Sequence, residues 1–166
     1  GIMYGAGPYR MSQELGVSRS EAALLIENYF NKYPGIQRYI DLTLSKARNY
    51  KFVETLLGRK RPILNANSDN GIIRKAAERM AINMPIQGSA AEMIKLAMIN
   101  IQRKINKTRL RSKLVLQIHD ELLFEFPAEE KKELIKLVVG EMENAVKLSV
   151  PIKVDYGVGQ SWFEAH

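Results

Sequence analysis

The chain has 166 residues, enough for one domain or two small lobes with a substantial core. Its 25 Lys and Arg outnumber 18 Asp and Glu, and the net charge of +7 favours a polyanionic partner such as nucleic acid, although many basic proteins have none. The absence of cysteine excludes disulfides, thiol catalysis and Cys-based zinc sites, and the two histidines argue against a multi-His metal site. No apolar run approaches the ~20 residues of a membrane span, and no signal-peptide pattern opens the chain.

Residues 1–7 read as the tail of an element whose start is missing. Because residue 1 is Gly rather than Met, we expect the chain to be a processed or split piece of a longer protein. The glycines of this stretch permit a tight turn. Tyr4 between them is either a packed aromatic or a stacking platform for a nucleic-acid base, and packing is the simpler interpretation.

The next part of the sequence predicts three short helices. Pro8 suits the first turn of a helix that Gly16 ends. Ser18 followed by Glu21 is a capping-box pair that opens the second. Apolar residues at helical spacing predict the third over 36–50. We see no chemistry in these helices.

Residues 52–57 are a strand candidate that ends in a cationic turn. Gly58 is followed by Arg59, Lys60 and Arg61. Three cations beside a glycine could hold a backbone phosphate, but most such clusters are solvated turns. The Asn-rich stretch over 65–71 predicts a loop.

A long helical region is predicted over 72–105. Pro85 lies inside it, lacks a backbone N–H and would clash with the preceding turn, so a kink or break is expected there. Ser89 with Glu92 three residues later could cap a second half of the helix.

Arg79, Asn83 and Gln87 are spaced by four residues and therefore share one stripe of this helix, at least up to the proline. Their donors and acceptors suit a base-pair edge or a sugar–phosphate contact. The alternative is an ordinary solvated face, but such faces usually carry Lys and Glu rather than two amides.

Residues 114–126 contain two apolar runs around three polar residues, His119, Asp120 and Glu121. The runs predict two strands of a hairpin, largely buried on both faces, with the polar residues at its turn. A charge between buried strands is costly unless it is paired or binds a metal. Asp is also a common turn residue, so a merely polar tip is an equal alternative.

Geometry limits how these acids could bind a metal. Adjacent strand residues point to opposite faces, so Asp120 and Glu121 are not expected to chelate one ion together. A second carboxylate would have to come from elsewhere. Oxygen ligands suit Mg²⁺, which takes one or two carboxylates plus substrate phosphates, and this combination in a basic protein suggests phosphoryl transfer on a nucleic acid.

An amphipathic helix over 129–148 and a strand over 152–158 are predicted to end the chain. Asp155 falls on the more polar face of that strand and is a weak candidate for the missing metal ligand. The shift from helices to strands predicts two lobes, 1–71 and 72–166.

These residues together resemble the carboxy-terminal part of a family A DNA polymerase, across essentially the whole chain. Each motif is weak alone, but their order is specific. The motifs are Tyr4-Gly5, Leu15-Gly16-Val17-Ser18, Thr55-Leu56-Leu57-Gly58-Arg59-Lys60-Arg61, Ala76-Ala77-Glu78-Arg79 to Gln87-Gly88, Ile118-His119-Asp120-Glu121, Gly157-Val158-Gly159-Gln160 to Trp162, and Ala165-His166.

The resemblance implies an α+β fold, with the helical later part of the fingers over 1–71 and half of a palm, an antiparallel sheet with flanking helices, over 72–166. It implies that Asp120 is a ligand of two catalytic Mg²⁺ ions and that Glu121 is a nearby catalytic acid with a smaller role. His119 would contact the primer end.

The same resemblance implies that Arg79, Asn83 and Gln87 contact the primer-template near the nascent pair. Tyr4 and Gly5 would lie at the pocket for the incoming deoxynucleoside triphosphate and the template base. Gly7 departs from the serine that the family often has at this position.

The family's other metal-binding aspartate motif, the Arg and Lys of the fingers helix, the thumb and any nuclease domain are missing from this sequence. The expected function is therefore that of a C-terminal fragment or subunit of a DNA-directed DNA polymerase, active only with an N-terminal part, on DNA and dNTP, in the cytoplasm and without a membrane partner. Two rivals are a non-catalytic nucleic-acid-binding remnant and a fragment of a single-subunit phage-like RNA polymerase. Glu121 and the chain end at 162–166 favour the DNA polymerase.

Overall fold

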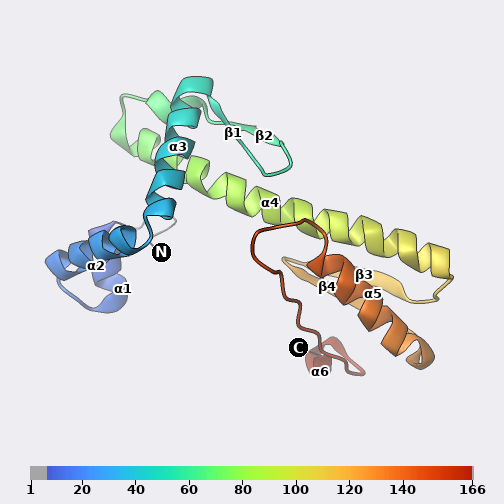
Figure 1. Cartoon of the computed structure of the whole chain (residues 1–166). Helices are drawn as coiled ribbons and strands as arrows, with labels where there is room; N and C mark the ends of the chain where they lie inside the picture. The colour runs from blue at the N-terminus through green and yellow to red at the C-terminus, as the bar shows by residue number, and fades with distance from the viewer. Residues whose placement is uncertain (1–6, 166) are drawn as a thin grey trace. The chain divides into compact units, whose positions relative to one another are not determined.

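The computed structural model describes residues 7–165, which fold into helices and two small antiparallel sheets (Figure 1). Two compact units divide between Ser89 and Ala90, inside the longest helix, and each is described by itself. The elements in chain order are α1 (Pro8–Leu15), α2 (Arg19–Lys32), α3 (Pro34–Tyr50), β1 (Phe52–Glu54), β2 (Lys60–Pro62), η2 (Leu64–Asn67), α4 (Gly71–Thr108), β3 (Lys113–Ile118), β4 (Glu121–Glu125), η3 (Ala128–Glu130), α5 (Lys131–Glu143) and α6 (Trp162–Ala165).

The three predicted helices of the first unit are confirmed. The Ser18 hydroxyl accepts from the Glu21 backbone N–H at 3.2 Å, and the Glu21 carboxylate accepts from the Ser18 N–H at 2.9 Å, so the predicted capping box opens α2. This pairing holds the pKa of Glu21 below its usual value, chiefly through the Ser18 side chain. The third helix begins at Pro34, two residues earlier than expected, because proline suits the first helical position.

The core of the first unit lies between α3, the β1–β2 hairpin and the start of α4. Val53 and Ile63 are its largest fully buried side chains, and small α4 residues such as Ala81 let the elements approach closely. The predicted strand over 52–57 is shorter than expected. It ends at Glu54, because the Thr55 N–H donates to the Arg59 carbonyl at 3.0 Å around a turn in which Gly58 has φ +84°.

Of the kink or break predicted at Pro85, the break is wrong, because α4 runs unbroken from Gly71 to Thr108. Ser89 therefore lies within the helix and does not cap a second one. Two side chains bond to carbonyls near the proline, since the Tyr39 hydroxyl donates to the Ile82 carbonyl at 2.8 Å and the Ser89 hydroxyl donates to the Pro85 carbonyl. The packing of Ala81 and Met84 in the core and the bond from Tyr39 stabilise the helix around the proline.

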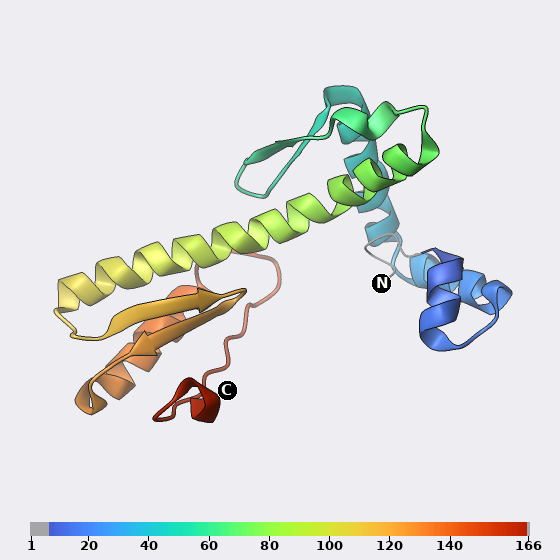
Figure 2. The same ribbon diagram turned by 180° about the vertical axis from the view of Figure 1, so that it is seen from behind.

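The second unit is built on the β3–β4 hairpin, which confirms the predicted strand pair. Figure 2 shows this hairpin beside α5 and the later part of α4. Leu122 and Phe124 of β4 pack against a cluster from these two helices that includes Ile101 and Leu134. The register pairs Leu116 with Leu123 and Ile118 with Glu121, with an irregularity between Leu114 and Leu116.

Burial of this hairpin on both faces is a prediction that the structure contradicts. Only one face packs on the helices; on β3, Val115 is 57% exposed and Leu116 46% exposed. The predicted strand over 152–158 is also absent, although all its residues are described. Hydrophobic alternation specifies a strand only where a neighbouring strand is present to pair with it, and β3 and β4 form a two-stranded sheet.

The predicted C-terminal helix is confirmed but shorter, since α5 covers Lys131–Glu143 and a single 3-10 turn precedes it. None of the helices within residues 7–165 is long and apolar enough to cross a membrane.

Candidate nucleic-acid and metal site

The three polar residues predicted at the hairpin tip lie there. His119 and Asp120 form the turn, and Ile118 pairs with Glu121 across it. His119 has φ +51°, in the left-handed region that non-glycine residues seldom adopt. Its carbonyl accepts a hydrogen bond from the Gln117 side chain at 2.7 Å, which helps to hold this conformation. Backbone strain of this kind tends to occur at functional sites.

The acids of the tip lie in different parts of the hairpin, Asp120 in the turn and Glu121 at the start of β4. Both Asp120 and Glu121 are accessible to solvent. Because Leu122 and Phe124 face the core, Glu121 lies on the opposite face with Leu123. That the two neighbouring carboxylates do not chelate one ion together stays a prediction.

The described residues do not form a complete metal site. Within residues 7–165, no group of three or more His, Cys, Asp or Glu could hold a metal ion. Asp120 still fits one side of a magnesium site, because it is a hard oxygen donor at the end of a rigid hairpin and is open to a ligand. Asp155 is exposed in the irregular segment after α5.

The polar stripe of α4 lies in the first unit. Arg79, Asn83 and Gln87 share one unbroken helix, so the spacing of four places them on one side of it. Arg79 and Gln87 are exposed, whereas Asn83 is half-buried and its Oδ1 atom has no hydrogen-bond partner in the described part of the chain. A buried amide oxygen without a partner is uncommon and can accept a bond from a ligand.

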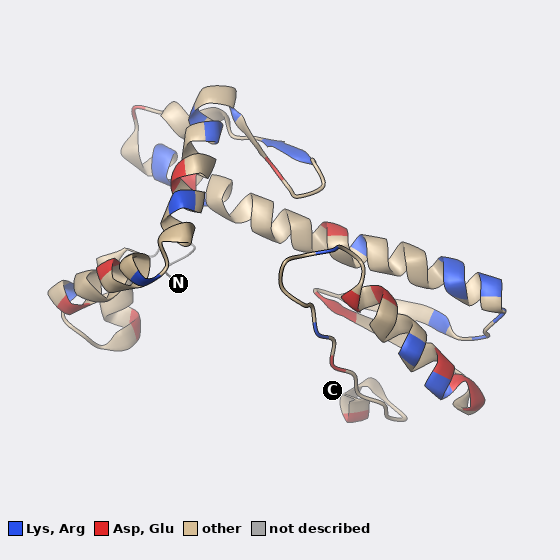
Figure 3. Ribbon diagram, viewed as in Figure 1, with Lys and Arg blue, Asp and Glu red and all other residues tan. Residues whose placement is uncertain are grey.

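The cationic turn of the first unit lies on the β1–β2 hairpin (Figure 3). Arg59, Lys60 and Arg61 are all exposed. The Lys60 ammonium lies 4.7 Å from the centre of the Phe52 ring, which supports one cation of the group. The hairpin thus presents positive charge on a surface suited to phosphate.

Glu54 partly balances this positive charge. Its pKa is held below the usual value, first by the hydrogen bond from Lys46; burial opposes this shift, and the charges of Lys46 and Lys60 add smaller lowering effects.

The residues of the hairpin tip belong to the second unit, and the stripe of α4 belongs to the first. The pocket residues Tyr4 and Gly5 lie outside the described residues, and Gly7, just before α1, is exposed.

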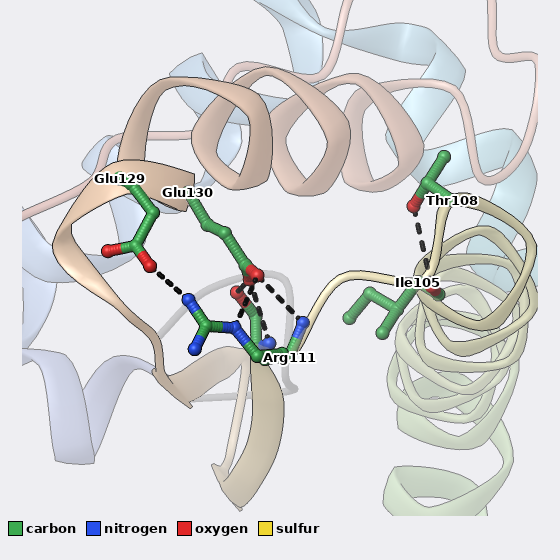
Figure 4. A network of polar contacts seen from close by, with 6 residues as sticks. Ile105, Thr108, Arg111, Glu129 and Glu130 are labelled. Atoms are coloured by element: carbon green, nitrogen blue, oxygen red, sulfur yellow. Dashed lines mark hydrogen bonds and ion pairs between the residues drawn. The ribbon is translucent and has the colours of Figure 1, made fainter.

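A set of hydrogen bonds at the start of β3 was missed in the sequence analysis (Figure 4). These bonds of Glu130 form an anchor for the β3–β4 hairpin, which is called the acidic hairpin because Asp120 and Glu121 lie at its tip. The Glu130 carboxylate accepts from the Arg111 N–H at 2.9 Å, the Ser112 N–H at 2.9 Å and the Ser112 hydroxyl at 2.6 Å. Arg111 also pairs with Glu129. No local pattern predicts the anchor, because its members are about 18 residues apart in sequence.

The anchor shifts the pKa of Glu130 below its usual value. The Ser112 hydroxyl contributes most, followed by the Arg111 N–H, and a smaller effect of burial opposes them.

Comparison with known proteins places the chain in a family. The family model described as DNA polymerase family A matches residues 1–164. This chain belongs to DNA polymerase family A. DNA polymerase I of Bacillus caldotenax is 47% identical over 165 residues, which cover 99% of this chain and 19% of that protein. DNA polymerase I of Caldicellulosiruptor bescii is 48% identical over 164 residues, again 99% of this chain and 19% of that protein.

A solved structure supports the same assignment to family A. The POL domain of Pol1 from M. smegmatis, in complex with DNA primer-template and dNTP, matches with a TM-score of 0.96 and 44% identity, over 99% of this chain and 29% of that one. The predicted α+β fold and the predicted family are therefore confirmed. This chain spans about a fifth of the length of the curated relatives that it matches.

Proposed function

We propose that this chain supplies one half of the active site of a DNA-directed DNA polymerase. The observation that carries the proposal is Asp120, an accessible carboxylate at the strained tip of a hairpin in a family A polymerase segment. The reaction would be nucleotidyl transfer from a dNTP to a primer 3′-hydroxyl. The primer oxygen forms a bond to the α-phosphorus, the bond to the β-phosphate breaks, pyrophosphate leaves, and the hydroxyl proton passes to solvent.

Asp120 would hold divalent cations, which we propose to be Mg²⁺. When bound, two such ions supply Lewis-acid stabilisation of the attacking and leaving oxygens. Because residues 7–165 contain no complete metal cluster, the remaining ligands would come from substrate phosphates and from a carboxylate outside these residues. Glu121 would add negative charge beside the site, and His119 would contact the primer end.

The stripe of α4 would hold the nucleic acid. Arg79 can pair with a phosphate, while the amides of Asn83 and Gln87 can donate to and accept from base edges and sugars. The unpartnered Asn83 Oδ1 supports this role, because a bound nucleic acid or water could supply the missing donor. Tyr4 and Gly5 would form part of the pocket for the dNTP and the template base.

The remaining carboxylate would lie in the N-terminal part of the polymerase, and the second unit offers a surface for that part. The outward face of the β3–β4 hairpin exposes Val115 and Leu116. A groove of about 1380 Å³ is lined by both of these residues, by other side chains of β4 and α5, and by the segment 154–165. Aliphatic side chains exposed together on a sheet are typical of an interaction surface. We propose that the N-terminal part of the polymerase covers it, since the matched relatives are about five times as long as the matched region.

The complex would act in DNA replication or repair in the cytoplasm. A non-catalytic nucleic-acid-binding remnant is the second candidate, because the described residues alone hold no complete metal cluster. The match to DNA polymerase family A favours the DNA polymerase over a phage-like RNA polymerase, and comparing dNTP with ribonucleotide incorporation tests this choice.

Primer extension tests the proposal. The chain alone is expected to be inactive, and addition of the N-terminal part is expected to restore extension. Asp120→Ala should lower the restored rate by about a thousandfold or more, since several kcal/mol of charge stabilisation are lost. Asp69→Ala, which removes an exposed acid in the loop before α4, is the matched control and should keep most of the activity. A restored rate that is unchanged by Asp120→Ala would exclude the metal role.

A further inference from the structure

Ser89 makes a link that neither the polymerase reaction nor the metal site explains. It lies inside α4 and is 5% exposed, yet its hydroxyl accepts a hydrogen bond from the Leu56 backbone N–H at 2.9 Å. The same hydroxyl donates to the Pro85 carbonyl one turn earlier. One buried hydroxyl thus joins the helix to the β1–β2 turn.

The contact around this link leaves little room for the hairpin to move. A Cβ atom on Gly88 would lie 2.7 Å from the Thr55 methyl group, so the absence of a side chain at Gly88 allows the turn to approach the helix. Thr55 is 4% exposed, and its hydroxyl accepts from the Arg59 N–H at 3.0 Å. The chain of bonds therefore runs from α4 through Leu56 and Thr55 to the first of the three cations.

We infer that Ser89 is a positioning residue for DNA binding, which fixes the cations of the β1–β2 hairpin relative to the Arg79–Gln87 stripe on the same helix. This inference rests on the proposed function for the identity of its ligand, a nucleic-acid backbone. The strands β1 and β2 are three residues each, and a hairpin this short is marginal by itself. Its orientation consequently depends on bonds to its neighbours, and the bond from Leu56 to Ser89 lies closest to the loop that precedes Arg59.

The position of the cations matters because phosphates are regularly spaced along a duplex. A β1–β2 hairpin that rotates away from α4 keeps its charge, but its cations and the stripe of α4 can no longer contact the same series of phosphates. The loss of the Ser89 hydroxyl should therefore weaken binding of primer-template without removing any group that contacts it. An effect of about three- to tenfold corresponds to the net value of a hydrogen bond.

The test measures binding of a fluorescent primer-template to the chain together with the N-terminal part. Ser89→Ala is expected to raise the Kd and the KM for primer-template about three- to tenfold, while kcat stays within about twofold. Ser89→Thr retains the hydroxyl and should restore wild-type binding. Ser45→Ala, which removes an exposed hydroxyl on α3, is the matched control and should have no effect.

A double variant shows whether Ser89 acts through the cations. In a chain that already carries Lys60→Gln and Arg61→Gln, Ser89→Ala should have little further effect on the Kd. Hydrogen exchange of the Leu56 amide should become faster in Ser89→Ala and stay slow in Ser89→Thr. The amide measurement does not require DNA and reports on the link even in a variant with low activity.

The inference is overturned if the wild-type complex binds primer-template and Ser89→Ala binds it equally well, or if the effect persists unchanged without the two cations. Loss of kcat with an unchanged KM would also overturn it, because that result indicates a merely structural role. Failure of the proposed function has a different signature, since neither the wild-type chain nor its variants would bind primer-template, although the Leu56 amide would still respond.

Discussion

The β1–β2 hairpin carries three cations, whereas the β3–β4 hairpin ends in Asp120 and Glu121. The first has strands of three residues, packs through Val53 in the core of its unit, and donates one hydrogen bond, from the Leu56 N–H, to the Ser89 hydroxyl of α4. The second has strands of six and five residues and is held by apolar packing on one face. Each hairpin thus presents the charge opposite to that of its proposed ligand: the cations of the first would bind phosphates, and the acids of the second would bind metal ions.

Truncation of side chains packed beneath the acidic hairpin should lower the free energy of unfolding much more than truncation of a side chain on its exposed face. Leu134→Ala and Ile101→Ala remove buried side chains from the cluster beneath the hairpin and should each lower the free energy of unfolding by about 2–5 kcal/mol. Leu116→Ala, on the exposed face, should change it by about 0.5 kcal/mol or less. Urea unfolding of the three variants measures this contrast. Equal losses at Leu134 and Leu116 would show that the outward face is part of the core.

The exposed face should matter once the partner is present. Leu116→Glu places a charge on the proposed interface and should weaken association with the N-terminal part by about tenfold or more, because an unpaired charge is costly to bury. Leu24→Glu is the matched control, since Leu24 is 58% exposed on α2. Calorimetric titration gives both affinities. A similar loss for the two variants would argue against this face as the interface.

The cationic hairpin is expected to act through its charge. Lys60→Gln and Arg61→Gln should each weaken primer-template binding at all sequences and should lower the slope of log K against log salt by about one. Lys147→Gln, an exposed lysine beyond α5, should leave the slope unchanged. Fluorescence titration over a salt series provides the slopes, and identical slopes in all three variants would exclude a phosphate contact at the hairpin.

The smallest expected effect is a difference in pH dependence between the hydrogen bonds that hold the two hairpins. Glu130, which anchors the start of β3, has a pKa below its usual value, whereas the Ser89 link does not titrate. The contribution of Glu130 is therefore present above its unfolded pKa of about 4.3 and is lost as the pH falls through the lower folded value.

Thermal unfolding of the wild type and Glu130→Gln measures this contribution. The wild type should have the higher Tm near pH 7, and the gap should narrow below about pH 4. A gap that is constant with pH would show that the carboxylate charge does not contribute.

Local sequence patterns predict several of these features correctly. The capping box of α2 and the hairpin with its polar tip depend on residues that are close in the chain. The candidate site residues at the tip are likewise found because an acid between two apolar runs is visible in sequence. Their roles in catalysis and DNA binding stay predictions.

The other features depend on contacts that are distant in sequence. The helix continues through Pro85 because Tyr39 and core packing support it, which a pattern within α4 cannot reveal. The segment over 152–158 has the alternation of a strand but no strand beside it in the two-stranded sheet. The Ser89 and Glu130 links join residues 33 and 18 positions apart, so they appear only in the folded chain.

Metal binding at the acidic tip is the most direct test of the central claim. The chain, its N-terminal part and primer-template with a non-hydrolysable dNTP are titrated with Mn²⁺, and free Mn²⁺ is followed by electron paramagnetic resonance. We predict that the wild-type complex binds Mn²⁺ at least about tenfold more tightly than the Asp120→Ala complex, because a carboxylate ligand is lost. Equal Mn²⁺ affinity in the two complexes would contradict the assignment of Asp120 as a metal ligand.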